Sequence, residues 1–265
     1  SSDVCSSDLA AGALEGRTIV VTRPRDQAGT LTGLIEDAGG HALLFPAIEI
    51  APIEDTRELD ELIARLGQFN WAIFVSPNAV AHAVSRIVAA GGLPASLRYA
   101  AVGRGTVRAL ARFGINDVLA PERFDSEALL ELPPLRDMSG QRVVIFRGVG
   151  GRELIAATLT ARGAHVEYAE CYRRRIPAID PAFLLEKWRQ GAIDAITVTS
   201  SEGLHNFAAL IGGEGVRLLR QTPVFVPHPR IAQAARELGV VTVVETAQGD
   251  DGVCASLEQW FSTRA

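Results

Sequence analysis

The chain has 265 residues, 48% of them hydrophobic, so it is long enough to bury two cores of moderate size. Its formal net charge of −5 and a pI near 5.6 argue against a nucleic-acid-binding protein, which would need a strongly basic face. The three cysteines, Cys5, Cys171 and Cys254, are too few and too widely spaced for a disulfide framework or a zinc site, and they favour a reducing cytoplasm.

The first segment, residues 1–13, is expected to be a disordered tail. It repeats Ser-Ser-Asp and has neither the basic start nor the apolar stretch of a signal peptide. Further along, no apolar run approaches the roughly 18 residues that a membrane span needs. We therefore expect folded structure from Leu14 onward and no membrane partner.

From Leu14 on, the chain alternates between apolar, β-branched runs and apolar stretches of helical period. A strand is expected at residues 18–22 with a helix from Gln27, and another strand at residues 195–199 with a helix from Glu202. Strands that alternate with helices in this way form parallel sheets with right-handed crossovers. The pattern predicts a doubly wound α/β fold.

The chain also contains an internal repeat, which we read as a duplication. RTIVVTR, ending at Arg23, matches QRVVIFR, ending at Arg147, an offset of 124 residues given by the difference between 147 and 23. The same offset relates Ser76 in FVSPNAV to Ser200 in VTSSEGL. A third block, AVGRGTVRALARFG from Ala101, lies opposite FVPHPRIAQAARELG. Each half thus carries three strand-to-helix units, and the repeat by itself places a domain boundary near residues 132–139.

Six loops are expected at the carboxyl ends of the strands, where ligands bind in open parallel sheets. Each loop begins a helix, whose first N–H groups have no partner within the helix and whose dipole end is positive, so each can receive an anionic group. Arginine adds a rigid fork that matches a carboxylate. The candidate ligand-binding residues in these loops are Arg23, Arg25, Ser76, Asn78, Gly103, Thr106, Arg147, Gly148, Gly151, Arg152, Ser200, Ser201, His228 and Arg230. The plainer alternative is that the serines cap helices and the arginines lie at ordinary helix starts. We expect a small polyanion in a cleft between two lobes.

Motifs for other chemistries are incomplete. A dinucleotide fingerprint requires G-x-G-x-x-G, but the run from Gly148 has Glu153 in the third position and the run from Gly103 has Arg108 there. The chain lacks a Walker-type phosphate loop and a G-x-S-x-G elbow, and its histidines do not have metal-helix spacing.

In the order and spacing of these blocks, the sequence resembles the uroporphyrinogen-III synthase family. VTRP, FVSPNAV, AVGRGT, FRGVGGRELIAATLTARGAHVEYAECYRR, VTSSEGLHNF and FVPHPRIAQAARELG carry the resemblance from about Leu14 to the C-terminus. It implies two doubly wound parallel-sheet domains of similar topology joined by a two-segment extended linker. Domain one would comprise residues 14–45 and 177–265, domain two residues 53–168, and the connectors residues 46–52 and 169–176.

The resemblance also implies an activity, a cofactor-free hydro-lyase that converts hydroxymethylbilane into uroporphyrinogen III. In this reaction water is lost and ring D is inverted through a spiro intermediate. The substrate partner would be a linear tetrapyrrole, which carries eight carboxylates. Tyr172 matches the family's tyrosine in the second connector and would assist departure of the hydroxyl, although Tyr168 lies close enough to confuse this assignment. No metal or organic cofactor is implied, and the protein is expected to be a cytoplasmic monomer.

Two other functions stay open at the sequence level. One is a two-lobed binding protein that closes on an anionic metabolite without catalysis. The other is an enzyme for a phosphorylated or nucleotide substrate, which the missing glycine pattern disfavours.

Overall fold

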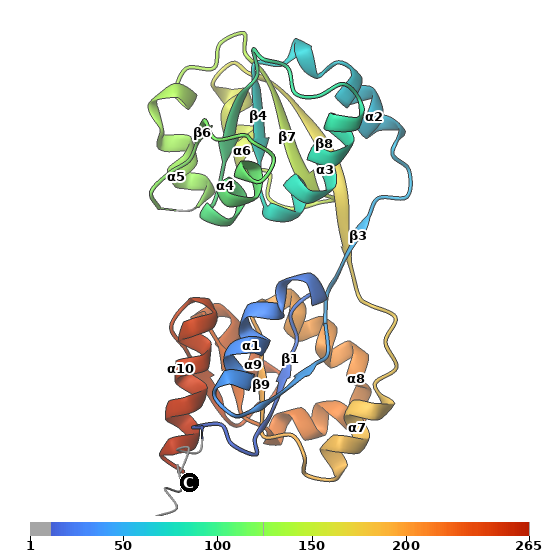
Figure 1. Cartoon of the computed structure of the whole chain (residues 1–265), viewed down its shortest axis with the longest axis vertical. Coiled ribbons are helices and arrows are strands. Elements are labelled where there is room, and N and C mark those ends of the chain that lie inside the picture. The colour runs from blue at the N-terminus through green and yellow to red at the C-terminus, as the bar shows by residue number, and fades with distance from the viewer. Residues whose placement is uncertain (1–11, 124, 265) are drawn as a thin grey trace, which may run out of the picture. The chain divides into compact units, whose positions relative to one another are not determined.

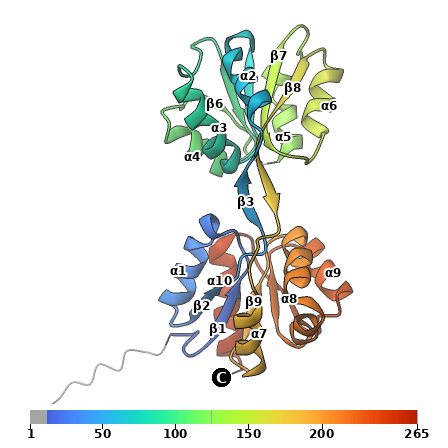
Figure 2. The same ribbon diagram turned by 90° about the vertical axis from the view of Figure 1, so that its right-hand side faces the viewer.

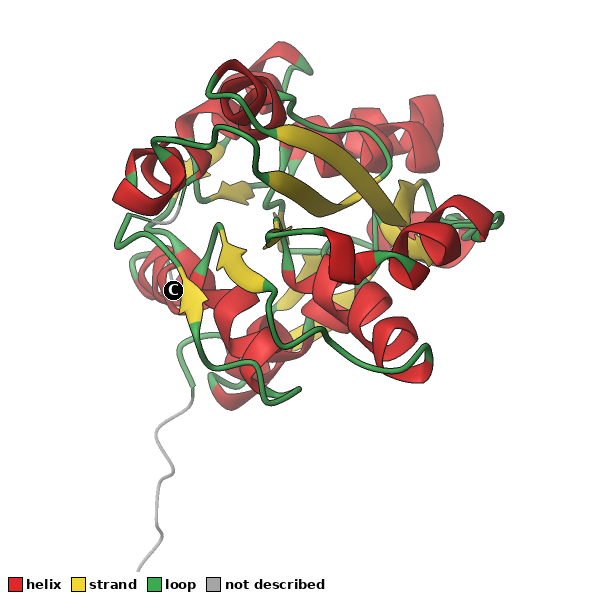
Figure 3. Ribbon diagram, turned by 90° about the horizontal axis from the view of Figure 1, so that it is seen from above, coloured by secondary structure: helices red, strands yellow, loops and turns green. Residues whose placement is uncertain are grey.

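The computed structural model describes residues 12–123 and 125–264, and it is an α/β fold built as two compact units (Figure 1). Unit 1 contains the described residues up to Glu49 and those from Arg175 onward, and unit 2 is Ile50–Arg174. Helices flank the strands of each unit and loops join them (Figure 3). The predicted fold class is confirmed.

Unit 1 is a parallel sheet with helices on both faces. The sheet order is β11-β10-β9-β1-β2, and every pairing along it is parallel. The strands are β1 (Thr18–Val21), β2 (His41–Leu44), β9 (Ala195–Thr197), β10 (Val224–Val226) and β11 (Val243–Glu245). The helices are the 3-10 turn η1 (Arg25–Gln27), α1 (Gly29–Asp37), α7 (Ala182–Arg189), α8 (Ser201–Gln221), α9 (Pro229–Glu237) and α10 (Gly249–Ser262).

Unit 2 repeats this design with one additional strand at the edge. Its sheet order is β3-β8-β7-β4-β5-β6, and the pairings from β8 to β6 are parallel. The strands are β3 (Glu49–Pro52), β4 (Trp71–Phe74), β5 (Arg98–Ala101), β6 (Val118–Leu119), β7 (Arg142–Gly148) and β8 (His165–Arg175). The helices are α2 (Arg57–Ala64), η2 (Leu66–Gln68), α3 (Pro77–Ala89), α4 (Arg104–Ala111), α5 (Ser126–Glu131), η3 (Pro133–Leu135) and α6 (Leu154–Ala161).

Each sheet is buried on both faces because alternate side chains of a strand point to opposite sides. In unit 2, Phe74 packs toward α2, α3 and α4, whereas its neighbour Ile73 packs toward α5 and α6. Phe74 also stacks on Phe146 of the adjacent strand with 4.6 Å between ring centroids. In unit 1, Val20 faces α7, α8 and α9, and Val21 faces α1 and α10. The two layers of helices around each sheet are visible in Figure 2.

The two sequence repeats exchange their parts between the units. The first repeat supplies β1, α1 and β2 to unit 1 but β4, β5 and β6 to unit 2, and the second repeat supplies the complementary parts. The boundary near residues 132–139 that the repeat favours is therefore wrong, because β7 pairs with β4 along four residues on the other side of it. The expected connectors, residues 46–52 and 169–176, contain β3 and the last part of β8.

The side-by-side strands β3 and β8 are joined by ion pairs as well as by the sheet. Arg175 contacts Glu49 at 2.8 Å, and Arg173 contacts Glu54. Proline bounds this region, since Pro52 ends β3 and Pro177 follows β8.

Two helices begin elsewhere than predicted. Arg25–Gln27 forms a separate 3-10 turn and α1 starts at Gly29, and neither start has a side-chain cap. Helix α8 begins at Ser201, one residue early, because the Ser200 hydroxyl accepts a hydrogen bond from the Gly203 N–H. The expected tail lies outside the described residues except for Gly12 and Ala13. Within the described part of the chain, no helix is both long and apolar enough to cross a membrane.

Candidate functional site

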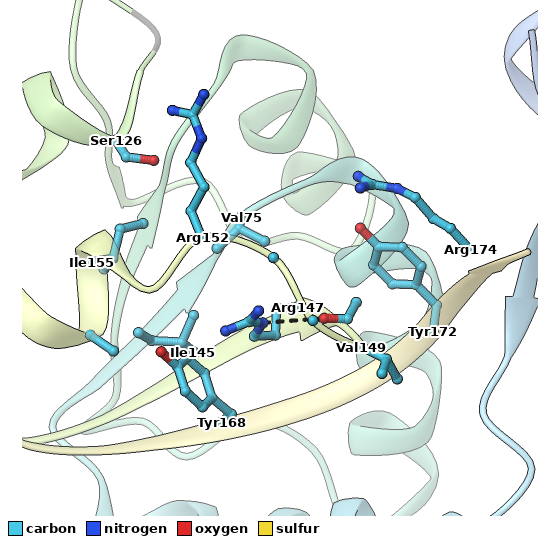
Figure 4. Close-up of a pocket in the computed structure, with 14 residues that line it drawn as sticks. Val75, Ser126, Ile145, Arg147, Val149, Arg152, Ile155, Tyr168, Tyr172 and Arg174 are labelled. Carbon is cyan, nitrogen blue, oxygen red and sulfur yellow. Dashed lines mark hydrogen bonds between the residues drawn. The ribbon is translucent and has the colours of Figure 1, made fainter. Parts of the chain in front are cut away.

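A pocket of about 200 Å³ lies at the carboxyl ends of β7 and β4 in unit 2 (Figure 4). The strand order reverses direction between these two strands, because β8 follows β7 on one side whereas β4, β5 and β6 succeed one another on the other. Such a switch point separates the two following loops and leaves room for a ligand. Arg147, Gly148, Gly151, Arg152 and Tyr172, all predicted from the sequence, line this pocket.

Arg147 is the buried cation of the pocket, with only 5% of the residue exposed. Its Nε donates to the Gly148 carbonyl at 3.2 Å, its Nη1 donates to Glu153 at 3.1 Å, and its guanidinium lies 4.4 Å from the centre of the Tyr168 ring. Nη2 is also buried, and no hydrogen-bond partner was found for it among the described residues. A buried polar group without a partner is costly, so this nitrogen retains a hydrogen-bonding capacity that the described residues do not use.

Glu153 and Tyr168 form a second layer against Arg147. The Tyr168 hydroxyl donates a hydrogen bond to Glu153. Burial and this hydrogen bond raise the pKa of Tyr168 to about 12. The hydrogen bonds from Tyr168 and then from Arg147 hold the pKa of Glu153 below its ordinary value, so Glu153 is an anion at neutral pH.

Tyr172 places its hydroxyl beside Ser76, with the two oxygens 3.0 Å apart. The residue is only 2% exposed, and its ring stacks on His82 with 5.8 Å between centroids. Ser76 caps α3, because its Oγ accepts from the Ala79 N–H at 3.1 Å. Either hydroxyl can donate in the contact between Ser76 and Tyr172, and when Ser76 donates, the phenol proton is left for another acceptor.

Gly148 allows the tyrosine to occupy this position. A Cβ atom on residue 148 would lie 2.7 Å from Cε2 of Tyr172, which is too close for two carbon atoms that are not bonded. The glycine also ends β7, where the pairing with β8 shifts register. Its absence of a side chain therefore explains how the Tyr172 ring can pack against the end of β7.

Three more predicted residues of unit 2 lie at helix starts. Gly103 is the N-cap of α4 and provides no side chain to satisfy the first N–H groups. Thr106 is buried in the first turn of that helix, and Asn78 lies in the first turn of α3. Arg152 is exposed, and its Nη1 lies 3.9 Å from Glu127.

In unit 1, the predicted residues occupy the equivalent loops after β1, β9 and β10. Arg23 makes an ion pair with Asp250 of α10 at 2.6 Å, so it already has an acidic partner. Ser200 caps α8, and the Oγ of its neighbour Ser201 is buried without a hydrogen-bond partner among the described residues. His228 caps α9 through Nδ1, which accepts from the Arg230 N–H at 3.1 Å.

Arg25 and Arg230 are exposed at these same helix starts. The structure thus divides the predicted residues between the strand ends of the two units. In unit 2 it brings Arg147, Gly148, Gly151, Arg152 and Tyr172 to one pocket, with Ser76 as the N-cap and Asn78 in the first turn of α3.

Sequence reasoning missed Glu153, Arg174 and Ser126 and left Tyr168 without a role in binding. In the sequence, Glu153 is only the residue that breaks a glycine motif. Its pairing with Arg147 depends on the fold of residues 148–152, which places Glu153 beside the Arg147 guanidinium. Ser126 and Arg174 reach the pocket from α5 and β8 by tertiary packing, which no local pattern reveals. Cys171 is buried beside the pocket, and burial raises the pKa of its thiol to about 12, so it is not a nucleophile.

Comparison with known proteins gives a consistent result. A family model described as uroporphyrinogen-III synthase HemD matches residues 29–253. The uroporphyrinogen-III synthase of Escherichia coli is 36% identical over 238 residues, which cover 88% of this chain and 97% of that protein. The enzyme of Synechococcus elongatus is 31% identical over 93% of this chain and 96% of its own length.

Among solved structures, a mutant uroporphyrinogen III synthase of the extremely thermophilic bacterium Thermus thermophilus has the same fold. Its TM-score is 0.61 at 20% sequence identity, over 94% of this chain and all of that one. The family match covers residues of both units. The chain therefore belongs to the uroporphyrinogen-III synthase family.

Proposed function

We propose that this protein is a uroporphyrinogen-III synthase, which closes hydroxymethylbilane to uroporphyrinogen III with loss of water and inversion of ring D. The observation that carries the proposal is the match over residues 29–253, together with 36% identity to the Escherichia coli enzyme. The proposal includes a cytoplasmic monomer that acts without a cofactor. A binding protein without catalysis has no comparable support.

Binding is assigned to the loops at the carboxyl ends of the strands. The substrate carries acetate and propionate groups, so a site must satisfy several carboxylates at once. Uncapped helix starts at Gly103 and Glu153 offer main-chain N–H groups, and Nη2 of Arg147 offers a buried charged donor. Arg23 and the hydroxyls of Ser200 and Ser201 are the corresponding groups in unit 1.

Tyr172 is assigned to the departure of the hydroxyl group. The adjacent electron-rich pyrrole expels the hydroxyl, the carbon–oxygen bond breaks, and a proton from the phenol converts the leaving group to water. The Ser76 hydroxyl, 3.0 Å away, donates to the phenol oxygen as negative charge develops there.

The remaining task of the protein is to hold the reacting ends of the chain. The azafulvene that forms must be attacked by the substituted carbon of the last ring, which gives the spiro intermediate, whereas unguided closure gives the uninverted isomer. Selecting one geometry by binding several carboxylates is catalysis through proximity and orientation.

The proposal is tested by incubating the purified protein with freshly prepared hydroxymethylbilane, oxidising the products and separating the uroporphyrin isomers. We expect isomer III to dominate, because the bound geometry favours the inverted closure. A product that is mostly isomer I, as in the control without protein, would refute the proposed activity. Such a result together with tight binding of an octacarboxylate porphyrin would favour the binding-protein alternative.

A further inference from the structure

The two repeat-equivalent arginines pair with acids that differ in their exposure to water. Arg23 pairs with Asp250, whose side chain is only 14% exposed, whereas Arg147 pairs with Glu153, whose side chain is 67% exposed. Water can solvate the Glu153 carboxylate when its ion pair opens, whereas Asp250 is largely shielded from water. Glu153 is thus the more easily displaced of the two acids.

Arg147 does not need Glu153 to stay in place. Its Nε is bonded to the Gly148 carbonyl, and its guanidinium lies on the Tyr168 ring. Glu153 contacts only Nη1, and Nη2 has no partner among the described residues. A carboxylate that entered the pocket could engage both terminal nitrogens in the two-pronged geometry that guanidinium favours, and would bind more strongly than Glu153 does.

We propose that Glu153 is an internal substitute for a substrate carboxylate, which occupies Arg147 in the unliganded pocket and yields to a carboxylate of the incoming tetrapyrrole. Tyr168 is the positioning residue for this exchange, because its hydroxyl keeps Glu153 beside the pocket. The inference rests on the proposed function for the identity of the ligand, but it needs only that the ligand is a polycarboxylate. Glu153 therefore lowers affinity, and its removal has the opposite effect to that expected of a binding residue.

The test is Glu153→Gln, which keeps the size of the side chain and its ability to accept hydrogen bonds but removes the competing charge. Binding of uroporphyrin III, an octacarboxylate probe, is measured by fluorescence titration at constant ionic strength. We expect the Kd to fall about three- to fivefold, because the probe no longer competes with a carboxylate for Arg147. The KM for hydroxymethylbilane should fall by a similar factor while kcat changes less than about twofold.

Glu186→Gln is the matched control. The Glu186 side chain is 59% exposed and pairs with Arg189 in unit 1 at 3.2 Å, so this variant makes the same change in net charge away from the pocket. It should leave the Kd for the probe unchanged. Tyr168→Phe keeps the ring under Arg147 but frees Glu153, and should lower the Kd about twofold.

Arg147→Gln completes a double-mutant cycle. In that background Glu153→Gln should no longer tighten binding, because the group for which the two carboxylates compete is gone. An unchanged or higher Kd in Glu153→Gln, or the same gain with and without Arg147, would overturn the inference. Because the probe is not turned over, a protein that lacks synthase activity can still confirm or refute this exchange.

Discussion

At the scale of single residues, the proposed chemistry depends on how Tyr172 is held. Its hydroxyl has Ser76 at 3.0 Å, and Gly148 makes room for its ring. The residue type and position follow from the family resemblance, but the Ser76 contact does not, since the two residues are 96 positions apart. Adjacency of β7 to both β4 and β8 brings them together.

Replacing Tyr172 by Phe should lower kcat about 10- to 100-fold with little change in KM. The loss is at or below the lower end of the range for general acid catalysis because the pyrrole itself assists departure of the hydroxyl. Steady-state assays with hydroxymethylbilane measure both constants. Tyr99→Phe is the control, because Tyr99 lies on β5 and does not line the pocket. If Tyr172→Phe turned over at the normal rate, the phenol would have no part in the reaction.

Several predicted binding residues cap helices, a role that the sequence analysis had allowed for the serines. Ser76, Ser200 and His228 each cap a helix through a side-chain atom, as Ser and Asn commonly do. A cap and a ligand contact use the same residue types at the same position, so the sequence cannot separate them. The pairing of Arg147 with Glu153 was missed for a related reason, because it depends on a loop whose Gly150 and Gly151 adopt positive φ.

At the scale of elements, the strand-to-helix loops are where local sequence is most informative. Residues 74–80 and 198–204 each lead from a buried strand into a helix capped by serine, so both turns were recognisable. The loop after β1 was less so, because Pro24 leads into a short 3-10 turn before α1 begins. No side chain caps either helix there, and a cap is the usual local sign of a helix start.

Gly148→Ala tests how the end of β7 shapes the pocket. The added Cβ would lie 2.7 Å from Cε2 of Tyr172, so the ring or the loop must shift, with a loss of about 1–3 kcal/mol in the free energy of unfolding. The Tyr172 hydroxyl should also leave Ser76, and kcat should fall. Urea unfolding and steady-state kinetics measure the two effects.

Gly33→Ala is the corresponding control in helix α1. An added Cβ there meets no atom within 4 Å, so this variant should gain up to about 1 kcal/mol in unfolding free energy through helix propensity. Equal stability of the wild-type protein and Gly148→Ala would mean that the ring is not packed as described.

At the scale of the whole molecule, the repeat predicts the architecture of each sheet but not the exchange between them. Both sheets combine two strands of one repeat with three strands of the other. In unit 1 the order β2-β1 is followed by β9-β10-β11, and in unit 2 the order β8-β7 is followed by β4-β5-β6. The periodicity is the same whether strands pair within a repeat or between repeats. Sequence comparison of the two halves therefore favours a wrong boundary, and only the family resemblance indicated the exchange.

The exchange predicts which fragments can fold. Residues 50–174 contain both core layers of unit 2 in one continuous segment, so we expect this fragment to unfold cooperatively in urea. Residues 12–132 contain strands of both sheets but complete neither, and should lack a cooperative transition by circular dichroism. A stably folded 12–132 fragment together with an unfolded 50–174 fragment would contradict the exchanged topology.

The central claim is that loops at the carboxyl ends of the strands bind the substrate's carboxylates, in large part through main-chain N–H groups. Amide hydrogen exchange with and without uroporphyrin III tests it most directly. We predict slower exchange at residues 22–28, 76–80, 103–107, 148–156, 200–204 and 228–232. Unchanged exchange in these loops, with slowing confined to the opposite strand ends near residues 94–98 and 138–142, would contradict the account.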